Sequence, residues 1–199
     1  MHAEIKDVIP IHWGKFINYY NFRLDDGRDY EVVSRRNLTL DKVINVDKLN
    51  SFKNADAVDI IAFSPDLEKI LIIKEWRYPL NDYVYAFPAG LCEPDESVPD
   101  AAKRELFEET GLEIDNVFDV LEPSYQSVGM TDEAVATIIC SAKGEITNKN
   151  ATENEDITPM WVTRSEARDL THHSKFSGRC QMVIAAWSWD AFFGRKCFN

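Results

Sequence analysis

The sequence predicts an α+β fold, with a small N-terminal antiparallel sheet ahead of a larger domain of buried strands and helices. Two strongly apolar runs, 58–63 and 70–73, flank a Ser-Pro-Asp tripeptide, a pattern typical of buried strands joined by a turn. Residues 97–110 have the apolar spacing of a helix with one face turned inward. Residues 16–36 alternate between apolar and polar side chains, as a half-buried hairpin does.

The N-terminal region is predicted to be a two-stranded hairpin that turns at Asp25-Asp26-Gly27. A lone two-stranded sheet is only marginally stable, so we expect it to pack on something else. Residues 37–54 are polar, have no convincing period, and are expected to connect the hairpin to the first buried strand. We therefore place a boundary near Ala55, between an N-terminal region 1–54 and a main domain 55–199.

The remaining elements are predicted from apolar runs and helix signals along the chain. Pro99 is tolerated in the first turn of the 97–110 helix, and Gly111 is well placed to end that helix. Ala101, Ala102, Leu106 and Phe107 supply much of its inward apolar face. The other predicted elements are short strands at 83–87, 134–140 and 160–162 and helices at 165–170 and from about 179 to 193.

Composition excludes several classes of function. The formal net charge of −12 argues against a nucleic-acid binder, whose affinity comes from clustered Lys and Arg. No apolar run approaches the length of about 18 residues that spans a membrane. The N-terminus has no signal-peptide pattern, and the four cysteines are far apart, so we expect reduced thiols and a cytoplasmic protein without a membrane anchor. An acidic protein that handles a polyanion must recruit cations, which directs attention to metal ions.

Three glutamates fall on one side of the predicted 97–110 helix. The spacing of Glu105, Glu108 and Glu109 brings their carboxylates within reach of a common point, where they repel one another. Only Lys103 and Arg104 are close enough to compensate. A hard divalent cation makes such a cluster favourable, and carboxylate and phosphate oxygens suit Mg²⁺ best. The alternative is a solvated acidic helix face, which is the commoner meaning of a Glu-rich helix.

The spacing of the whole stretch decides between these alternatives. It contains seven specified residues and two apolar positions over 23 residues, in the order Gly90-x5-Glu96-x7-Arg104-Glu105-Leu106-x-Glu108-Glu109-x-Gly111-Leu112. This stretch resembles the Nudix box at every defined position. The resemblance implies the Nudix fold, with a mixed β-sheet sandwiched between helices, and a metal-dependent hydrolase of diphosphate compounds.

The resemblance also implies roles within the box. Glu105 and Glu109 would ligate Mg²⁺, with Mn²⁺ as an alternative metal. Glu108 would be a further ligand, direct or through water, with a part in catalysis, and the backbone carbonyl of Ala89 would join the ligands. Arg104 would orient the glutamates by ion pairing, and we therefore group it with the catalytic residues.

The flanks of the box narrow the resemblance to one subfamily, over about residues 20–140. The two stretches that lead into the box look like those of ADP-ribose pyrophosphatases, and read Lys74-Glu75-Trp76-Arg77-Tyr78-Pro79 and Tyr85-Ala86-Phe87-Pro88-Ala89-Gly90. By this resemblance Arg77 contacts the diphosphate, Trp76 stacks on the base, and Arg36 or Arg35 reaches the substrate. An arginine fork and an aromatic plane suit these tasks. The alternatives for Arg77 and Trp76 are a surface ion pair and a half-buried core aromatic.

Downstream, the segment Ser127–Glu133 resembles the catalytic loop of that subfamily. The resemblance implies that Glu133 is the general base or positions the water, and that Gly129 lies in the substrate-binding part of the loop. The alternative for Glu133 is a turn glutamate before the next strand. Val128 departs from the proline that is usual at its position, which puts the substrate in more doubt than the chemistry.

The sequence predicts hydrolysis of a nucleoside-diphosphate sugar, with ADP-ribose leading and AMP and ribose 5-phosphate as products. Hydrolases of GDP-mannose or UDP-sugars share most of these features. A nucleotide-sensing module without activity is a further alternative, although such modules commonly lose box carboxylates that this chain keeps. An isomerase of isopentenyl diphosphate is more remote. Relatives also imply a homodimer in which the N-terminal hairpin helps to build the nucleoside pocket of the partner.

Overall fold

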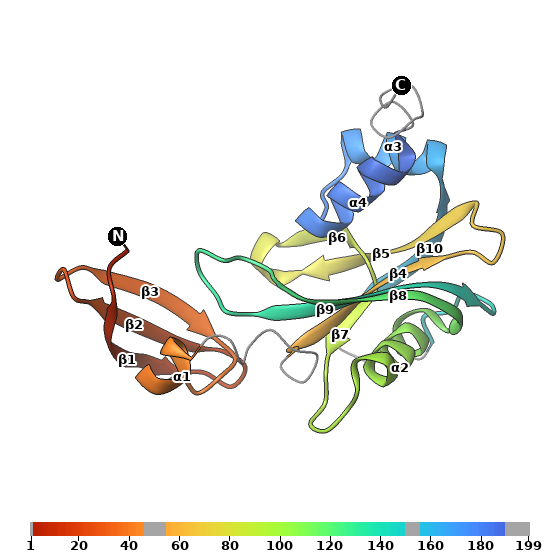
Figure 1. Cartoon of the computed structure of the whole chain (residues 1–199). Coiled ribbons are helices and arrows are strands. Elements are labelled where there is room, and N and C mark those ends of the chain that lie inside the picture. Colours follow the sequence, from red (N-terminus) through yellow and green to blue (C-terminus); the bar gives the residue numbers. More distant parts are fainter. Residues whose placement is uncertain (1, 46–54, 150–155, 190–199) are drawn as a thin grey trace, which may run out of the picture. The chain divides into compact units, whose positions relative to one another are not determined.

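The structure, a computed structural model, describes residues 2–45, 55–149 and 156–189 and forms two compact units (Figure 1). The first unit joins Met1–Ala57 to Leu121–Ala136, and the second joins Val58–Val120 to Thr137–Asn199. In chain order the elements are β1 (Ile5–Trp13), β2 (Asn18–Leu24), β3 (Asp29–Ser34), α1 (Leu40–Ile44), β4 (Ala57–Phe63), β5 (Lys69–Arg77), the 3-10 turn η3 (Tyr78–Leu80), β6 (Asp82–Ala86), β7 (Ala89–Leu91), α2 (Val98–Thr110), β8 (Glu113–Tyr125), β9 (Ala134–Lys143), β10 (Ile157–Thr163), α3 (Arg164–His173) and α4 (Gly178–Ser188).

The first unit contains a three-stranded antiparallel sheet in the order β1-β2-β3. The predicted hairpin is confirmed as β2 and β3, and Gly27 in its turn has a φ of 85°. The sequence did not predict β1, because the register of its pairing shifts near Asp7 and near Pro10. Such bulges interrupt the two-residue alternation by which a strand is recognised.

A small core stabilises this sheet. Tyr20, Phe22 and Val32 are buried together, and Val43 of α1 packs against them. The Tyr20 hydroxyl donates a hydrogen bond to the Arg36 carbonyl over 3.0 Å, which ties the end of β3 to the centre of the sheet. The predicted connection 37–54 therefore begins with a short helix that covers the sheet, while residues 46–54 lie outside the described part of the chain.

The second unit is built on a mixed sheet with the order β10-β5-β4-β9-β8, to which β6 adds by pairing with β5 and β7 by pairing with β4. The strands predicted at 58–63, 70–73, 134–140 and 160–162 lie within β4, β5, β9 and β10. The strand predicted at 83–87 is present as β6, which ends one residue earlier, at Ala86. Helices α3 and α4 cover one face of the sheet and α2 covers the other (Figure 1). The predicted α+β class, with a mixed sheet between helices, is confirmed.

The core under α3 and α4 is formed by the apolar runs. Ile61, Ile70 and Ile72 of the central strands pack against Ala167 of α3 and Ile184 of α4. These side chains are almost fully removed from water, and burial of each large one contributes about 1.5–3 kcal/mol to folding. The two central strands and both helices therefore share one continuous core.

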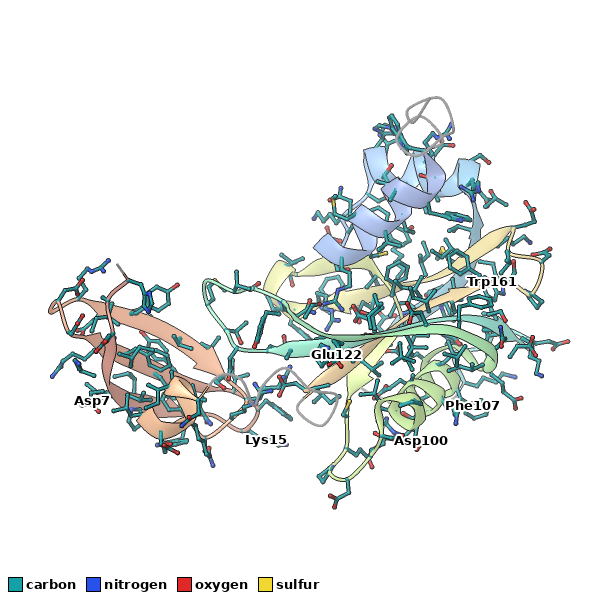
Figure 2. All side chains as sticks on the ribbon, in the orientation of Figure 1. Asp7, Lys15, Asp100, Phe107, Glu122 and Trp161 are labelled. Carbon is teal, nitrogen blue, oxygen red and sulfur yellow. The ribbon has the colours of Figure 1, made fainter. Side chains whose placement is uncertain are left out.

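Helix α2 begins and ends where the sequence predicts. The Ser97 side chain caps it by accepting the Asp100 N–H, and Gly111 ends it in the left-handed conformation, with φ 73°. One inward position was predicted wrongly: Phe107 is 47% exposed, and Figure 2 labels it beside the exposed Asp100. The buried face is instead completed by Glu109, which is only 4% exposed. Phe107 and Glu109 lie on nearly opposite sides of the helix, so the buried face includes a carboxylate that the apolar spacing did not predict.

Strand β8 was not predicted from the sequence. Its side chains are mostly exposed, and it lies at the edge of the sheet beside β9. An edge strand with solvent on both faces has no alternating pattern, because neither face selects apolar side chains. Figure 2 labels one of its exposed residues, Glu122.

The end of α2 gives a stability prediction. A Cβ at Gly111 would lie 2.3 Å from Thr147 Cγ2, and the backbone there has a positive φ. We expect Gly111→Ala to lower the free energy of unfolding by at least about 1–3 kcal/mol, measured by urea denaturation. Gly27→Ala is the matched control, because its φ is also positive but a Cβ there meets nothing within 4 Å. Equal losses in both variants would contradict the contribution of the Thr147 contact.

Candidate active site

The box residues come together where β7 runs against α2. Three consecutive residues of β7 each meet a different side chain of the helix. The Ala89 N–H donates to Glu109 Oε2 over 3.1 Å, and the Leu91 carbonyl accepts from Arg104 Nη2 over 3.0 Å. Between these two contacts lies Gly90. The backbone of a three-residue strand thus holds the charged side of α2 in place.

Gly90 is a glycine because a carboxylate occupies the place of its side chain. A Cβ built on Gly90 would lie 1.8 Å from Cδ of Glu105 and 1.9 Å from Oε1. No φ in the left-handed region requires glycine here, so the requirement comes from this close approach alone. The glycine of the motif is therefore explained by the contact between the Gly90 backbone and the Glu105 carboxylate.

Arg104 holds the acidic side chains together. Its Nε and Nη2 donate to the two carboxylate oxygens of Glu96, each over 2.9 Å. Its Nη1 donates to Glu105 over 2.8 Å and to Glu108 over 3.2 Å. These bonds raise the pKa of Arg104, with the bond to Glu96 as the largest cause. The same bond lowers the pKa of Glu96 and keeps it ionised.

The three box glutamates differ in their exposure to water. Glu109 is 4% exposed, the side chain of Glu105 is 12% exposed and that of Glu108 is 41% exposed. A buried carboxylate is costly unless hydrogen bonds or cations compensate its charge. Glu109 and Glu105 therefore depend on compensation from their surroundings, while Glu108 is still partly stabilised by water.

The chemistry of these side chains fits a hard divalent cation, since their donors are carboxylate and carbonyl oxygens. Within residues 2–45, 55–149 and 156–189, however, no three His, Cys, Asp or Glu side chains are already gathered as a metal site. Arg104 lies among the box carboxylates, where its Nη1 donates to Glu105 and Glu108 and supplies positive charge to both. A cation would share or replace that compensation.

The flanking residues lie at the end of β5 in the same unit. Trp76 packs edge-on against Tyr83 of β6, with ring centroids 5.2 Å apart and an interplanar angle of 79°. Arg77 pairs with Glu75 over 2.5 Å, and its side chain is 55% exposed. Arg77 thus forms a surface ion pair and Trp76 packs as a partly buried aromatic, which were the alternatives to their substrate roles. The substrate roles stay predictions. The sequence did not single out Tyr83, because its partner is on the neighbouring strand.

The remaining candidates lie in the first unit. Glu133 pairs with Arg35 over 2.8 Å, and Gly129 accepts a hydrogen bond from the Tyr30 hydroxyl over 2.8 Å. Arg36 is braced between Asp56, over 2.8 Å, and Asp132, over 3.1 Å. The sequence names Arg35, Arg36, Gly129 and Glu133, but it does not show that these residues contact one another or their acidic neighbours.

Comparison with known proteins identifies the family. The sequence model of the NUDIX domain matches residues 53–179, which is more than half of the chain. The chain belongs to the Nudix family. It is a Nudix hydrolase, and members of this family generally use divalent metal ions.

Its relatives include several ADP-ribose pyrophosphatases. One from Escherichia coli (strain K12) is 28% identical over 148 residues, which cover 68% of each chain. One from Bacillus subtilis is 32% identical, over 59% of this chain and 63% of the relative. The ADP-sugar pyrophosphatase of Mus musculus is 43% identical over a shorter stretch, 30% of this chain and 28% of the relative.

A solved structure supports the fold over the whole chain. The crystal structure of an ADP compounds hydrolase aligns with a TM-score of 0.68 and 19% identity, and the match covers 98% of this chain and 97% of the other. In the described ranges, no helix is both long enough and apolar enough to cross a membrane.

The contact between Gly90 and Glu105 gives a prediction about metal affinity. In Gly90→Ala the new Cβ displaces the Glu105 carboxylate, which is the flexible end of a side chain, so the fold is expected to survive. We expect Mn²⁺ affinity, measured by calorimetry, to fall about 10-fold or more, with little change in melting temperature. The control is Gly178→Ala, where a Cβ meets nothing within 4 Å. Unchanged Mn²⁺ affinity in Gly90→Ala would show that Glu105 does not ligate the metal.

Proposed function

We propose that this Nudix hydrolase splits the pyrophosphate bond of a nucleoside-diphosphate sugar, with ADP-ribose converted to AMP and ribose 5-phosphate and Mg²⁺ as the preferred metal. One observation carries the proposal. The Glu105 and Glu109 carboxylates lie against the backbone of β7, and Arg104 binds Glu105 and Glu108 together. This arrangement supplies the carboxylate oxygens that would bind a hard divalent cation, and through it a diphosphate.

The protein groups divide the work between holding the cation and moving a proton. Glu105, Glu109 and the Ala89 carbonyl would hold Mg²⁺ or Mn²⁺, and Glu108, the most exposed of the three glutamates, would add a ligand directly or through water. When bound, the cation neutralises charge on the phosphoryl oxygens and makes a water more acidic. Arg104 keeps the glutamates oriented and limits their mutual repulsion.

Hydrolysis requires a base for the attacking water, and we assign that task to Glu133. The water oxygen forms a bond to phosphorus while the bond from phosphorus to the bridging oxygen breaks. Glu133 accepts a proton from the water, and the leaving phosphate departs with the electron pair of the broken bond. The side chain of Glu133 is 25% exposed, so water can still reach it.

The choice of ADP-ribose is supported by the relatives and by the residues at the end of β5. ADP-ribose pyrophosphatases from two bacteria align over most of this chain. Trp76 would stack on the adenine, with Tyr83 supporting its ring, while Arg77 would bind the diphosphate. By the resemblance, Gly129 and Arg36 would also contact the substrate. We extend the proposal to a cytoplasmic homodimer in which region 1–54 helps to form the nucleoside pocket, on the resemblance alone.

A substrate panel tests the reaction. The chain is incubated with Mg²⁺ and ADP-ribose, GDP-mannose, UDP-glucose, diadenosine polyphosphates or NADH, and released mononucleotides are separated by chromatography. We expect AMP and ribose 5-phosphate from ADP-ribose at the highest kcat/KM, and no turnover after EDTA treatment. Faster release of GMP or UMP would reassign the substrate within the same chemistry. If no compound is turned over in the presence of metal, the proposed enzymatic activity is contradicted.

The assigned roles predict different losses in variants. Glu109→Gln should remove nearly all activity, because it deletes a ligand charge, and Glu133→Gln should lower kcat by about 100-fold or more, the scale of a lost general base. Glu122→Gln, on the exposed edge strand β8, is the control and should be as active as the wild type. Circular dichroism verifies that each variant is folded. Full activity in Glu133→Gln would refute its assignment as the base.

A further inference from the structure

The segment Ser127–Glu133, here called the Glu133 loop, has an internal framework. The N–H groups of Met130 and Thr131 both donate to the Ser127 carbonyl, over 2.8 and 3.0 Å. At its base, the Gln126 N–H donates to the Glu133 carbonyl over 3.1 Å. These bonds close the loop into a compact turn, so a contact at one point restrains its neighbours.

The loop is also attached to strand β3. The Val33 N–H donates to the Met130 carbonyl over 2.9 Å, and Val33 and Thr131 form a short parallel bridge. The Tyr30 hydroxyl adds its bond to the Gly129 carbonyl. Strand β3 is at one edge of the three-stranded sheet, and the loop therefore satisfies backbone groups that an edge would leave to water.

A second brace holds the chain on both sides of Glu133. Arg36 donates to the carbonyl and to a carboxylate oxygen of Asp132, each over 3.1 Å, and pairs with Asp56. Asp56 Oδ2 in turn accepts the Ala134 N–H over 2.8 Å. The backbone positions before and after Glu133 are thereby fixed, which leaves the side chain of Glu133 as the part still to be oriented.

That side chain is oriented by Arg35. Its Nε donates to Glu133 Oε1 over 2.8 Å, and the two side chains are 33% and 25% exposed. An ion pair of this partial burial is less screened than a surface pair, and its hydrogen bond restricts how the carboxylate can turn. Arg35 comes directly after the end of β3, so the strand that holds the loop backbone also supplies the cation for its acid.

We propose that Arg35 is a positioning residue of the hydrolysis, acting through Glu133 and not through the substrate. The inference rests on the proposed function, since it assigns a task to the contact only if Glu133 handles the proton of the attacking water. It replaces the expectation that Arg35 reaches the substrate. A carboxylate held in one orientation is always ready to accept the proton, whereas a freely turning one spends part of its time in unproductive orientations. The rate of proton transfer therefore depends on the Arg35 contact.

A double-mutant cycle tests this coupling. kcat and KM for ADP-ribose are measured for Arg35→Ala, Glu133→Gln and the double variant. We expect Arg35→Ala to lower kcat about 10-fold or more with KM within about 2-fold, since a residue that acts through the base affects the chemical step. The double variant should be no slower than Glu133→Gln alone, within about 2-fold. Arg35→Lys should recover part of kcat by restoring a cation.

Three results would overturn the proposal. If the fold loss of kcat in the double variant equals the product of the two single losses, Arg35 acts independently of Glu133. A raised KM with unchanged kcat would make Arg35 a substrate contact. Wild-type kinetics in Arg35→Ala would leave it no role. Arg23→Ala serves as the matched control, because Arg23 also pairs with an acid of the same sheet, but its side chain is 57% exposed; we expect wild-type kinetics from it.

Inactive wild-type protein would be a different failure, since it would overturn the proposed function. Hydrogen exchange then tests the structural half of the inference without any substrate. Peptides that cover residues 126–134 should exchange within about 2-fold of the wild-type rate in both Arg35→Ala and Arg23→Ala, because Arg36, Asp56 and β3 hold the loop backbone. Exchange at least about 10-fold faster in Arg35→Ala would show that Arg35 holds the loop backbone, and would overturn its assignment to the Glu133 side chain.

Discussion

The structure around α2 depends on the compensation of negative charge by Arg104. Carboxylates on adjacent turns of one helix repel, and two of the box glutamates are largely removed from water. Arg104 meets this constraint with bonds to Glu96, Glu105 and Glu108 from a single guanidinium. The same group reaches the Leu91 carbonyl, so charge compensation and the close approach of β7 to the helix are achieved together. Compensation of the carboxylate charge thus requires β7, the absence of a side chain at Gly90 and helix α2 together.

The first unit applies the same principle to a loop. Arg35 and Arg36 are adjacent in the chain, but they pair with different acids, and the pairs hold the side chain of Glu133 and the backbone next to it. Edge pairing with β3 supplies the remaining restraint. The N-terminal sheet, which has a small core of its own, thus also holds the loop that carries Glu133.

Local signals made the fold and the box predictable. The Ser97 cap, Pro99 and Gly111 place the ends of α2 without knowledge of the rest of the chain. Strands β1 and β8 were missed because bulges and two-sided exposure remove the alternation that marks a strand. Phe107 was misplaced because apolar spacing alone does not show which apolar side chain of a helix faces solvent. The pair of Arg35 with Glu133 joins residues 98 positions apart, and no local pattern encodes such a contact.

The attachment of the Glu133 loop determines how much of the chain is needed to hold that loop in place. The stretch that matches the NUDIX domain begins at residue 53. It contains the box and Glu133, but it omits Tyr30, Val33 and Arg35, which fasten the loop. A chain shortened to the family's shared stretch would keep each signature residue and lose the anchorage of its loop. The stretch that matches the family model therefore differs from the compact unit to which the loop belongs, because that unit also includes the N-terminal sheet.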